Sequence, residues 1–74
     1  MCGISGIIYK NNNNGLEIFE SLLSIQHRGQ DGGGISCVDT KDLYIGKGLI
    51  HNLFDHEQLN NMKGKMYLGH TRYK

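Results

Sequence analysis

The sequence predicts a small α+β domain of 74 residues. Short apolar runs, each long enough for one strand, flank a single clear amphipathic helix, and two of these runs lie close enough together to form a hairpin. The chain also has eleven glycines and no proline, which suits tight turns and close backbone approaches. The expected order of elements is strand, helix, strand, strand, helix, strand.

The first part of the chain predicts a strand followed by a helix. Ile4 to Tyr9 is a short apolar run that suits a buried strand, and the asparagines at 11–14 suit a solvated loop. Apolar residues then recur at helical spacing from Gly15 to Ile25. We expect Asn14 to cap this helix and Glu17 to complete a capping box.

The next part predicts a loop and then a hairpin. Gln30 to Gly34 contains three consecutive glycines, which favours a flexible or tightly turned loop. Ile35 to Val38 and Leu43 to Ile45 are apolar runs separated by a polar turn, as in two paired strands.

The last part predicts short helical turns and a final strand. Leu49 to Phe54 places its apolar residues on one helical face, and Asp55 with Gln58 forms a second capping pair. Lys65 to Gly69 suits a strand that carries the polar residues His70 to Tyr73 at its end.

Bulk properties exclude several classes of function. The net charge is +1 and the lysines are scattered, so the chain shows neither a nucleic-acid nor a membrane footprint. No apolar run approaches the length of a membrane span. Cys2 and Cys37 are the two cysteines, and no signal peptide is evident, so we expect free thiols and a cytoplasmic location. The cysteine and histidine spacings match no usual metal-ligand pattern, so we expect no metal or cofactor within this chain.

The first candidate for chemistry is Cys2, directly behind the initiator methionine. Removal of Met1 would leave Cys2 with a thiol and a free α-amine on one residue. Thiols attack as thiolates, and an α-amine titrates near ~7.7–8.0, which suits a general base. Cys2 could then carry both the nucleophile and its base. The alternative is that Cys2 simply begins a buried strand, because cysteine is a common core residue.

Two further polar clusters hold more reactive groups than packing requires. Gln26-His27-Arg28-Gly29-Gln30-Asp31 follows the helix, and Gly69-His70-Thr71-Arg72-Tyr73 follows the last apolar run. An arginine at a strand end can hold a carboxylate through two parallel hydrogen bonds. Taken singly, each cluster also fits a structural role, as the cationic end of a helix or as an exposed strand terminus.

In this order and spacing, the three clusters resemble the class II glutamine amidotransferases, and most closely the amidophosphoribosyltransferase branch. Gln26 before His27 and Gln30 before Asp31 favour that branch over the glucosamine-6-phosphate synthases and the asparagine synthetases. The resemblance extends over essentially the whole chain. It implies an N-terminal-nucleophile hydrolase fold, a four-layer αββα sandwich of which residues 2–74 would form the first part.

The resemblance also implies a reaction and roles for five residues. Cys2 would attack the side-chain amide of glutamine, form a thioester and release ammonia. Arg72 would hold the substrate α-carboxylate and Arg28 would support the loop around the nucleophile. His70 and Tyr73 match positions at the substrate site, with Tyr73 coupling it to the acceptor site.

The same resemblance implies partners outside this chain. The ammonia would pass to phosphoribosyl pyrophosphate in a separate transferase domain of a homo-oligomeric parent, giving phosphoribosylamine for purine synthesis, with Mg²⁺ in that missing domain. The alternatives are another acceptor, such as fructose-6-phosphate or aspartate, and an inactive αβ fragment.

The sequence departs from the family pattern in several places. Gly32 and Gly33 stand where the family more often has serine or alanine, and Lys74 stands where proline commonly follows the tyrosine. The family's oxyanion-hole pair, Asn-Gly, would lie beyond Lys74.

Overall fold

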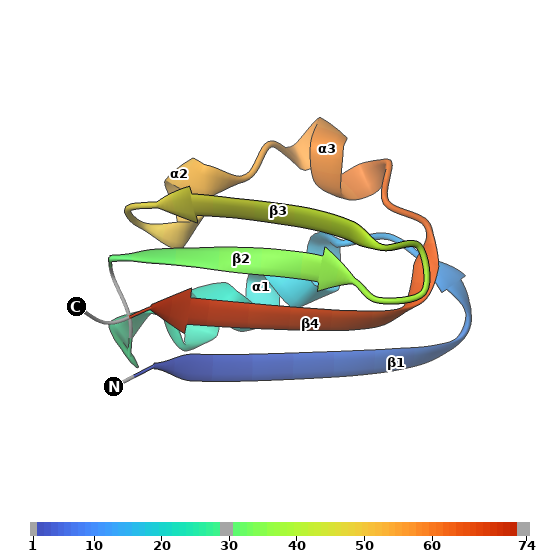
Figure 1. The fold of residues 1–74 in the computed structure, drawn as a ribbon, viewed down its shortest axis with the longest axis horizontal. Coiled ribbons are helices and arrows are strands. Elements are labelled where there is room, and N and C mark those ends of the chain that lie inside the picture. Colours follow the sequence, from blue (N-terminus) through green and yellow to red (C-terminus); the bar gives the residue numbers. More distant parts are fainter. Residues whose placement is uncertain (1, 29–30, 73–74) are drawn as a thin grey trace.

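The helices and strands follow the expected order in the computed structural model, which describes residues 2–28 and 31–72 (Figure 1). Their bounds are β1 (Gly3–Asn13), α1 (Leu16–Ser24), the 3-10 turn η1 (Gln26–Arg28), β2 (Gly32–Cys37), β3 (Asp42–Lys47), α2 (Ile50–Leu53), α3 (His56–Asn60) and β4 (Gly64–Arg72). The predicted α+β class is confirmed, and the second helical region is divided into α2 and α3.

The described strands form one antiparallel sheet of four strands in the order β1-β4-β2-β3. The last strand in sequence, β4, therefore lies between β1 and β2 (Figure 1). β2 and β3 form the predicted hairpin, whose turn contains Lys41 at φ 64°. β1 and β3 are the two edges of this sheet, and β1 reaches the rest of it through β4 alone.

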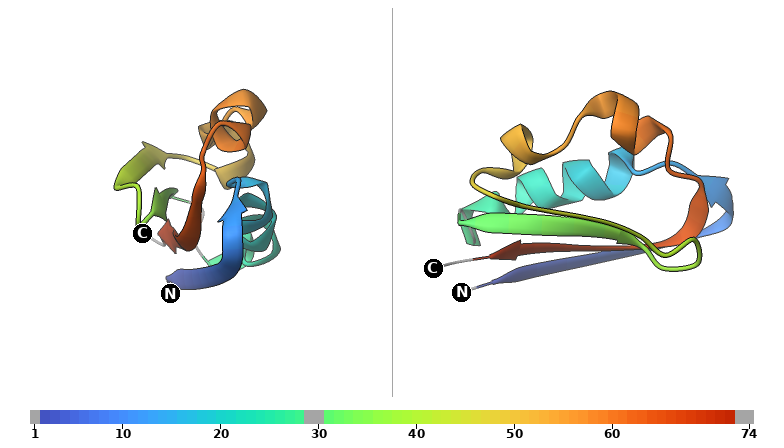
Figure 2. Two further views of the ribbon diagram at one scale, coloured as in Figure 1. Left: turned by 90° about the vertical axis from the view of Figure 1, so that its right-hand side faces the viewer. Right: turned by 45° about the horizontal axis from the view of Figure 1, so that its top comes forward.

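The helices cover one face of the sheet, as Figure 2 shows. Side chains from α1, α2, α3, the segments just after α2 and α3, and the facing sides of the strands form the core: Ile18, Phe19, Leu22, Ile35, Cys37, Ile50, Phe54, Leu59, Met62 and Tyr67. We call the other face of the sheet the open face. It carries exposed apolar side chains, among them Ile4, Ile8, Leu43, Ile45 and Leu68. One helical layer on one sheet is compatible with half of a four-layer αββα sandwich.

The start of α1 differs in detail from the predicted capping box. The N-cap residue is Gly15, which makes no side-chain capping bond. Asn14 does accept a hydrogen bond from the Leu16 N–H (3.1 Å), so it satisfies one of the free donors at the helix start. Glu17 instead accepts a hydrogen bond from the Tyr9 hydroxyl (3.0 Å). The box does not close because Glu17 is used to tie α1 to β1.

The asparagine run is not the loop that was predicted. β1 continues to Asn13, which pairs with Gly64 after an irregularity in the β1–β4 register between Ile8 and Asn13. The Asn13 carbonyl accepts a hydrogen bond from the buried Tyr67 hydroxyl (2.6 Å). This long-range contact, which local composition cannot reveal, holds the polar run in the strand.

The prediction of a loop at Gln30 to Gly34 is also wrong for the three glycines, because β2 begins at Gly32. β2 pairs with β3 on one side and β4 on the other. A Cβ on Gly32 would lie 2.7 Å from the Gly46 carbonyl oxygen, and one on Gly33 would lie 2.7 Å from that of His70. Glycine is needed here because neighbouring backbone comes close, and not because the segment turns.

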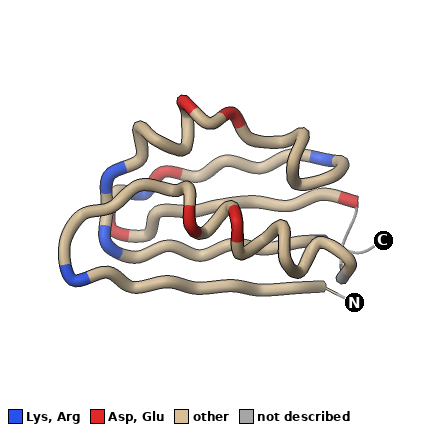
Figure 3. The backbone as a smooth tube through the Cα atoms, turned by 180° about the vertical axis from the view of Figure 1, so that it is seen from behind, with Lys and Arg blue, Asp and Glu red and all other residues tan. Residues whose placement is uncertain are grey.

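Charged residues lie mainly on the helices and near the turns and strand ends (Figure 3). In the β2–β3 turn, Asp39 accepts hydrogen bonds from the backbone N–H groups of Lys65 (2.9 Å) and Met66 (3.3 Å). The Lys65 bond is the main cause that lowers the pKa of Asp39 from its usual value. At α3, Asp55 is the N-cap as predicted, and its side chain accepts from the Glu57 N–H.

Candidate functional site

The pairing register places Cys2 and Arg72 at the same end of the sheet. Gly3 pairs with Thr71 in the β1–β4 ladder, and Cys2 and Arg72 are the residues next to this pair at the same end of the two strands. Cys2 is exposed and its thiol is free. Residues 70 positions apart in the chain therefore lie at the same end of the sheet because β4 pairs directly with β1.

A row of residues crosses the sheet at this end. Arg72 pairs with Gly32, and Gly32 pairs with Lys47. We call Lys47, Gly32 and Arg72 the Arg72 row. Paired residues of antiparallel strands point to the same face, so both cationic side chains of this row lie on the open face. The glycine between them leaves the space above β2 without a side chain.

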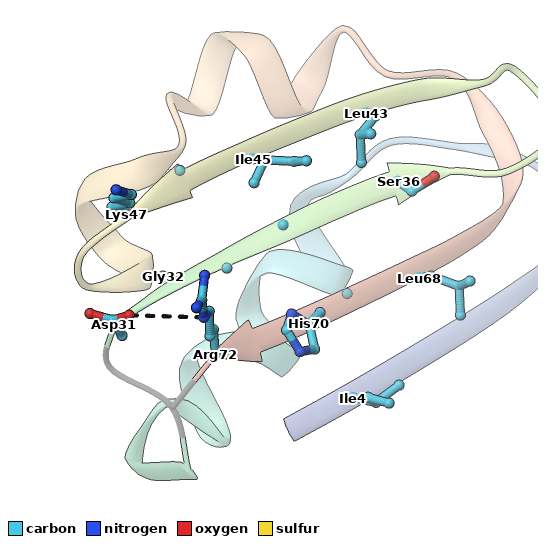
Figure 4. Close-up of a pocket in the computed structure, with 14 residues that line it drawn as sticks. Ile4, Asp31, Gly32, Ser36, Leu43, Ile45, Lys47, Leu68, His70 and Arg72 are labelled. Atoms are coloured by element: carbon cyan, nitrogen blue, oxygen red, sulfur yellow. Dashed lines mark ion pairs between the residues drawn. The ribbon is translucent and has the colours of Figure 1, made fainter. Parts of the chain in front are cut away.

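His70 lies in the next row on the same face. It pairs with Ile4 on one side and with Gly34 on the other. Figure 4 shows His70 and Arg72 on β4 with Ile4 and Leu68 nearby. A histidine and an arginine thus adjoin an apolar surface at the end of the sheet that bears Cys2.

A hollow of about 730 Å³ lies over the open face beside these residues. Its polar end contains Asp31, Lys47, His70 and Arg72 (Figure 4). The rest is lined by glycines of β2, β3 and β4, by Ser36 and by four apolar side chains: Ile4, Leu43, Ile45 and Leu68. The hollow exists because glycines replace side chains along the middle of the sheet. It could hold a ligand with one anionic end.

Asp31 forms an ion pair with Arg72 at the polar end of the hollow, and no role was predicted for it. The Asp31 Oδ2 atom lies 3.9 Å from the Arg72 Nε atom, and the two side chains are 41% and 66% exposed. The Asp31 N–H also donates to the Arg72 carbonyl (2.9 Å). The sequence feature that could have indicated Asp31 is its position as the last residue of the polar cluster after the helix.

The close contacts around Gly3 favour a glycine directly after Cys2. A Cβ on Gly3 would lie 2.7 Å from the Thr71 Oγ1 atom and 2.9 Å from the Ile25 Cδ1 atom. These atoms are on the helical side of the sheet, opposite to the hollow. The Thr71 hydroxyl is buried and has no hydrogen-bond partner among the residues that the structure describes. Gly3 therefore lets β1 lie close against β4 and α1 directly behind the nucleophile candidate.

No family model matches the chain, but individual proteins do. The amidophosphoribosyltransferase of Methanocaldococcus jannaschii is 42% identical over 76 aligned positions that cover 99% of this chain. The enzymes of the same name from Pseudomonas aeruginosa and Schizosaccharomyces pombe are 42% and 40% identical, again over 99% of this chain. This chain is a relative of the amidophosphoribosyltransferases. It spans only 15–16% of the length of these three proteins.

The structure brings together three of the five site residues implied by the amidophosphoribosyltransferase resemblance. Cys2, His70 and Arg72 lie at one end of the open face. Arg28 belongs to η1, which contacts β4, although the structure does not describe its side chain. Tyr73 and the initiator Met1 lie outside the described residues.

The 3-10 turn η1 is joined to the start of α2 through Gln26. The Gln26 Oε1 atom accepts a hydrogen bond from the Ile50 N–H at the start of α2 (2.7 Å). The Ile50 side chain is fully buried and lies over Gly33 of β2. The turn that carries Arg28 is therefore held at its first residue.

The described residues contain no group of three or more histidine, cysteine, aspartate or glutamate side chains that could hold a metal ion. Within the same residues, no helix is both long enough and apolar enough to cross a membrane.

Proposed function

We propose that this chain carries the nucleophile and the substrate-carboxylate site of a glutaminase, in a protein that uses the ammonia for transfer. The main support is that Cys2 and Arg72 lie at the same end of the sheet, where the hollow has its cationic end. The similarity to amidophosphoribosyltransferases along 99% of the chain supports the same reading.

The reaction would begin once Met1 has been removed. The α-amine of Cys2 takes the thiol proton, and the sulfur attacks the side-chain carbonyl carbon of glutamine. The carbon–nitrogen bond then breaks while a proton passes to the nitrogen, so ammonia leaves and a thioester remains. Water cleaves the thioester to give glutamate and the free thiol. The exposure of Cys2 supports this role, because a buried thiol could not reach a substrate.

The cationic residues would bind the substrate. Arg72 would hold the α-carboxylate through two parallel hydrogen bonds, and its place one strand from Cys2 suits a ligand that extends between them. Arg28 would support the segment around Cys2. His70 and Tyr73 would complete the substrate site, with Tyr73 relaying its occupancy to the acceptor site.

The acceptor of the ammonia would be phosphoribosyl pyrophosphate, giving phosphoribosylamine for purine synthesis in the cytoplasm. The shared name of the relatives supports this acceptor over fructose-6-phosphate or aspartate. The Mg²⁺ implied for phosphoribosyl transfer would bind in the transferase domain.

The test uses the protein expressed from its complete gene. Glutamine-dependent formation of glutamate and phosphoribosylamine should be lost in Cys2→Ala, while formation from ammonium salts should persist. Cys37→Ala is the matched control, because Cys37 is the buried thiol of the core and should not affect the chemistry. Undiminished glutamine use by Cys2→Ala would exclude the proposed nucleophile.

Mass spectrometry of the intact protein tests the activation step separately. The active protein should begin at Cys2 with an unmodified α-amine. Active protein that retains Met1, or whose α-amine is acetylated, would refute the proposed base.

A further inference from the structure

We infer that Asp31 is a positioning residue that orients the guanidinium of Arg72 toward a ligand carboxylate in the hollow. This inference rests on the proposed function, because it concerns how the substrate carboxylate is bound.

Asp31 is fixed by its backbone on both sides. Its N–H donates to the Arg72 carbonyl (2.9 Å), and its own carbonyl accepts from the Gly48 N–H (3.0 Å). The Gly48 bond continues the pairing of β2 with β3 by one residue, and the Arg72 bond joins Asp31 to the end of β4. The carboxylate therefore starts from a defined position next to Arg72, although the side chain itself is 41% exposed.

The Asp31 carboxylate faces the Nε edge of Arg72. Its Oδ2 atom lies 3.9 Å from Nε, a separation typical of an ion pair rather than a short hydrogen bond. A guanidinium has one N–H on Nε and four on its two terminal nitrogens. With Asp31 beside Nε, the terminal edge remains available for two parallel bonds to another carboxylate. Figure 4 shows this pair at the polar end of the hollow.

The charges around Asp31 leave the polar end of the hollow able to bind an anion. Lys47 lies in the same row as Arg72, on the far side of Gly32, and it also lines the hollow. The polar end thus holds two cations and one carboxylate, which leaves an excess positive charge for an anionic ligand. Asp31 could instead compete with the ligand for Arg72. Removing its charge would then lower the KM for glutamine, whereas losing a positioning residue would raise it.

The experiment measures glutamine kinetics in the protein expressed from its complete gene. Asp31→Asn keeps the shape of the side chain and removes its charge. It should raise the KM for glutamine roughly two- to fivefold, the range that an exposed ion pair can contribute, with kcat changed by less than about twofold. Asp42→Asn is the matched control: Asp42 lies at the opposite end of the hairpin and accepts a bond from the Thr40 hydroxyl (2.9 Å). This variant should leave KM unchanged.

A double-mutant cycle assigns the effect to Arg72. Lysine has no Nε–H of the guanidinium kind, so Asp31→Asn should have no further effect on KM in an Arg72→Lys background. A lowered or unchanged KM in Asp31→Asn would overturn the inference, as would an equal rise in the Arg72→Lys background.

A nuclear magnetic resonance measurement keeps the test independent of catalysis. The ¹⁵N–¹H resonance of the Arg72 Nε group should shift in Asp31→Asn and stay in place in Asp42→Asn. Identical Arg72 resonances in wild type and Asp31→Asn would overturn the pairing even in a fully active enzyme. A shifted resonance in a protein that does not hydrolyse glutamine would refute the proposed function and support the pairing.

Discussion

At the scale of single residues, Arg72 should act on glutamine binding and not on use of ammonia. It is 66% exposed at the mouth of the hollow, so its truncation should leave the fold intact. Arg72→Ala should raise the KM for glutamine by roughly 30- to 1,000-fold, because a charge-assisted bidentate contact contributes about 2–4 kcal/mol. Steady-state assays with glutamine and with ammonium salts give the two activities.

Arg72→Lys provides the matched variant for this prediction. It keeps the positive charge and should recover only part of the affinity, since an ammonium group cannot form the two parallel bonds. Equal loss of the glutamine- and ammonia-dependent activities in Arg72→Ala would instead indicate a structural role.

Tyr67 should make the stability of the fold sensitive to alkaline pH. Its buried hydroxyl donates to the Asn13 carbonyl (2.6 Å) and accepts from the Gly64 N–H (3.2 Å). Burial is the main cause that raises the pKa of Tyr67 to about 12. In the unfolded chain a tyrosine ionises near pH ~10. The free energy of unfolding should thus be independent of this group below about pH 10 and fall as the pH rises toward 12.

Denaturant unfolding at a series of pH values checks the Tyr67 prediction. Tyr67→Phe should cost about 1–3 kcal/mol at neutral pH, because it leaves two backbone groups without their partner. It should also weaken the alkaline dependence. Tyr9→Phe should remove a further part, since burial and the bond to Glu17 raise the pKa of Tyr9 to about 12. An unchanged pH dependence in both variants would contradict this account.

At the scale of elements, periodicity was enough to predict every strand and the long helix, while the ends of these elements were often misplaced. Ile4 to Tyr9 and Gly15 to Ile25 carry their pattern within the segment itself. The asparagine run and the glycines of β2 carry no such pattern, because partners far away in the sequence decide their secondary structure. Asn13 is held by Tyr67, and Gly32 lies between β3 and β4. Local composition favours loops in both places, and sheet pairing overrides it.

The same limit applies to the site. The residue types of the clusters indicated Cys2 and Arg72 without any knowledge of pairing, and the resemblance to the class II glutamine amidotransferases added His70. Asp31 was missed because its significance comes from the register that places it beside Arg72. That register depends on β4 lying between β1 and β2, which the order of elements along the chain does not fix.

Gly33 gives a direct test of sheet packing. A Cβ at this position would collide with the Ile50 Cδ1 atom and lie 2.7 Å from the His70 carbonyl oxygen. Since backbone cannot move aside easily, Gly33→Ala should lower the free energy of unfolding by about 1–3 kcal/mol. Thermal or denaturant unfolding of the purified variant measures this change.

Gly6→Ala is the matched control for Gly33→Ala. Its Cβ would lie 3.4 Å from the Leu68 Cδ2 atom, an ordinary contact with a side chain. This variant should be neutral or stabilising by up to about 1 kcal/mol, because alanine has less backbone entropy to lose than glycine. Equal stability of the two variants would show that β2 is not packed as described.

At the scale of the whole molecule, the open face should make the isolated 74-residue chain associate. Ile4, Ile8 and Ile45 are 77%, 76% and 75% exposed on this face. Such an apolar surface favours contact with other chains, and both edges of the sheet can add strands. Sedimentation velocity of the expressed chain should show oligomers or aggregates, and the chain should not hydrolyse glutamine.

Variants on the two faces identify the surface responsible. Ile4→Lys combined with Ile45→Lys should shift the isolated chain toward the monomer, whereas Glu20→Lys, an exposed change on α1, should not. A monomeric wild-type chain with a sharp cooperative melt would contradict the prediction, and glutamate release that depends on Cys2 would contradict the lack of activity.

The central place of β4 has a consequence for the order of events during synthesis. β1 leaves the ribosome first, but in the described sheet it pairs only with β4, the last of these strands to emerge. Until then α1 and the β2–β3 hairpin can form from local contacts, while β1 waits as an unpaired strand with exposed isoleucines. When β4 inserts between β1 and β2, it completes the sheet and at the same time brings Arg72 to the end of the sheet that bears Cys2. A nascent chain should therefore acquire its reactive end late and all at once.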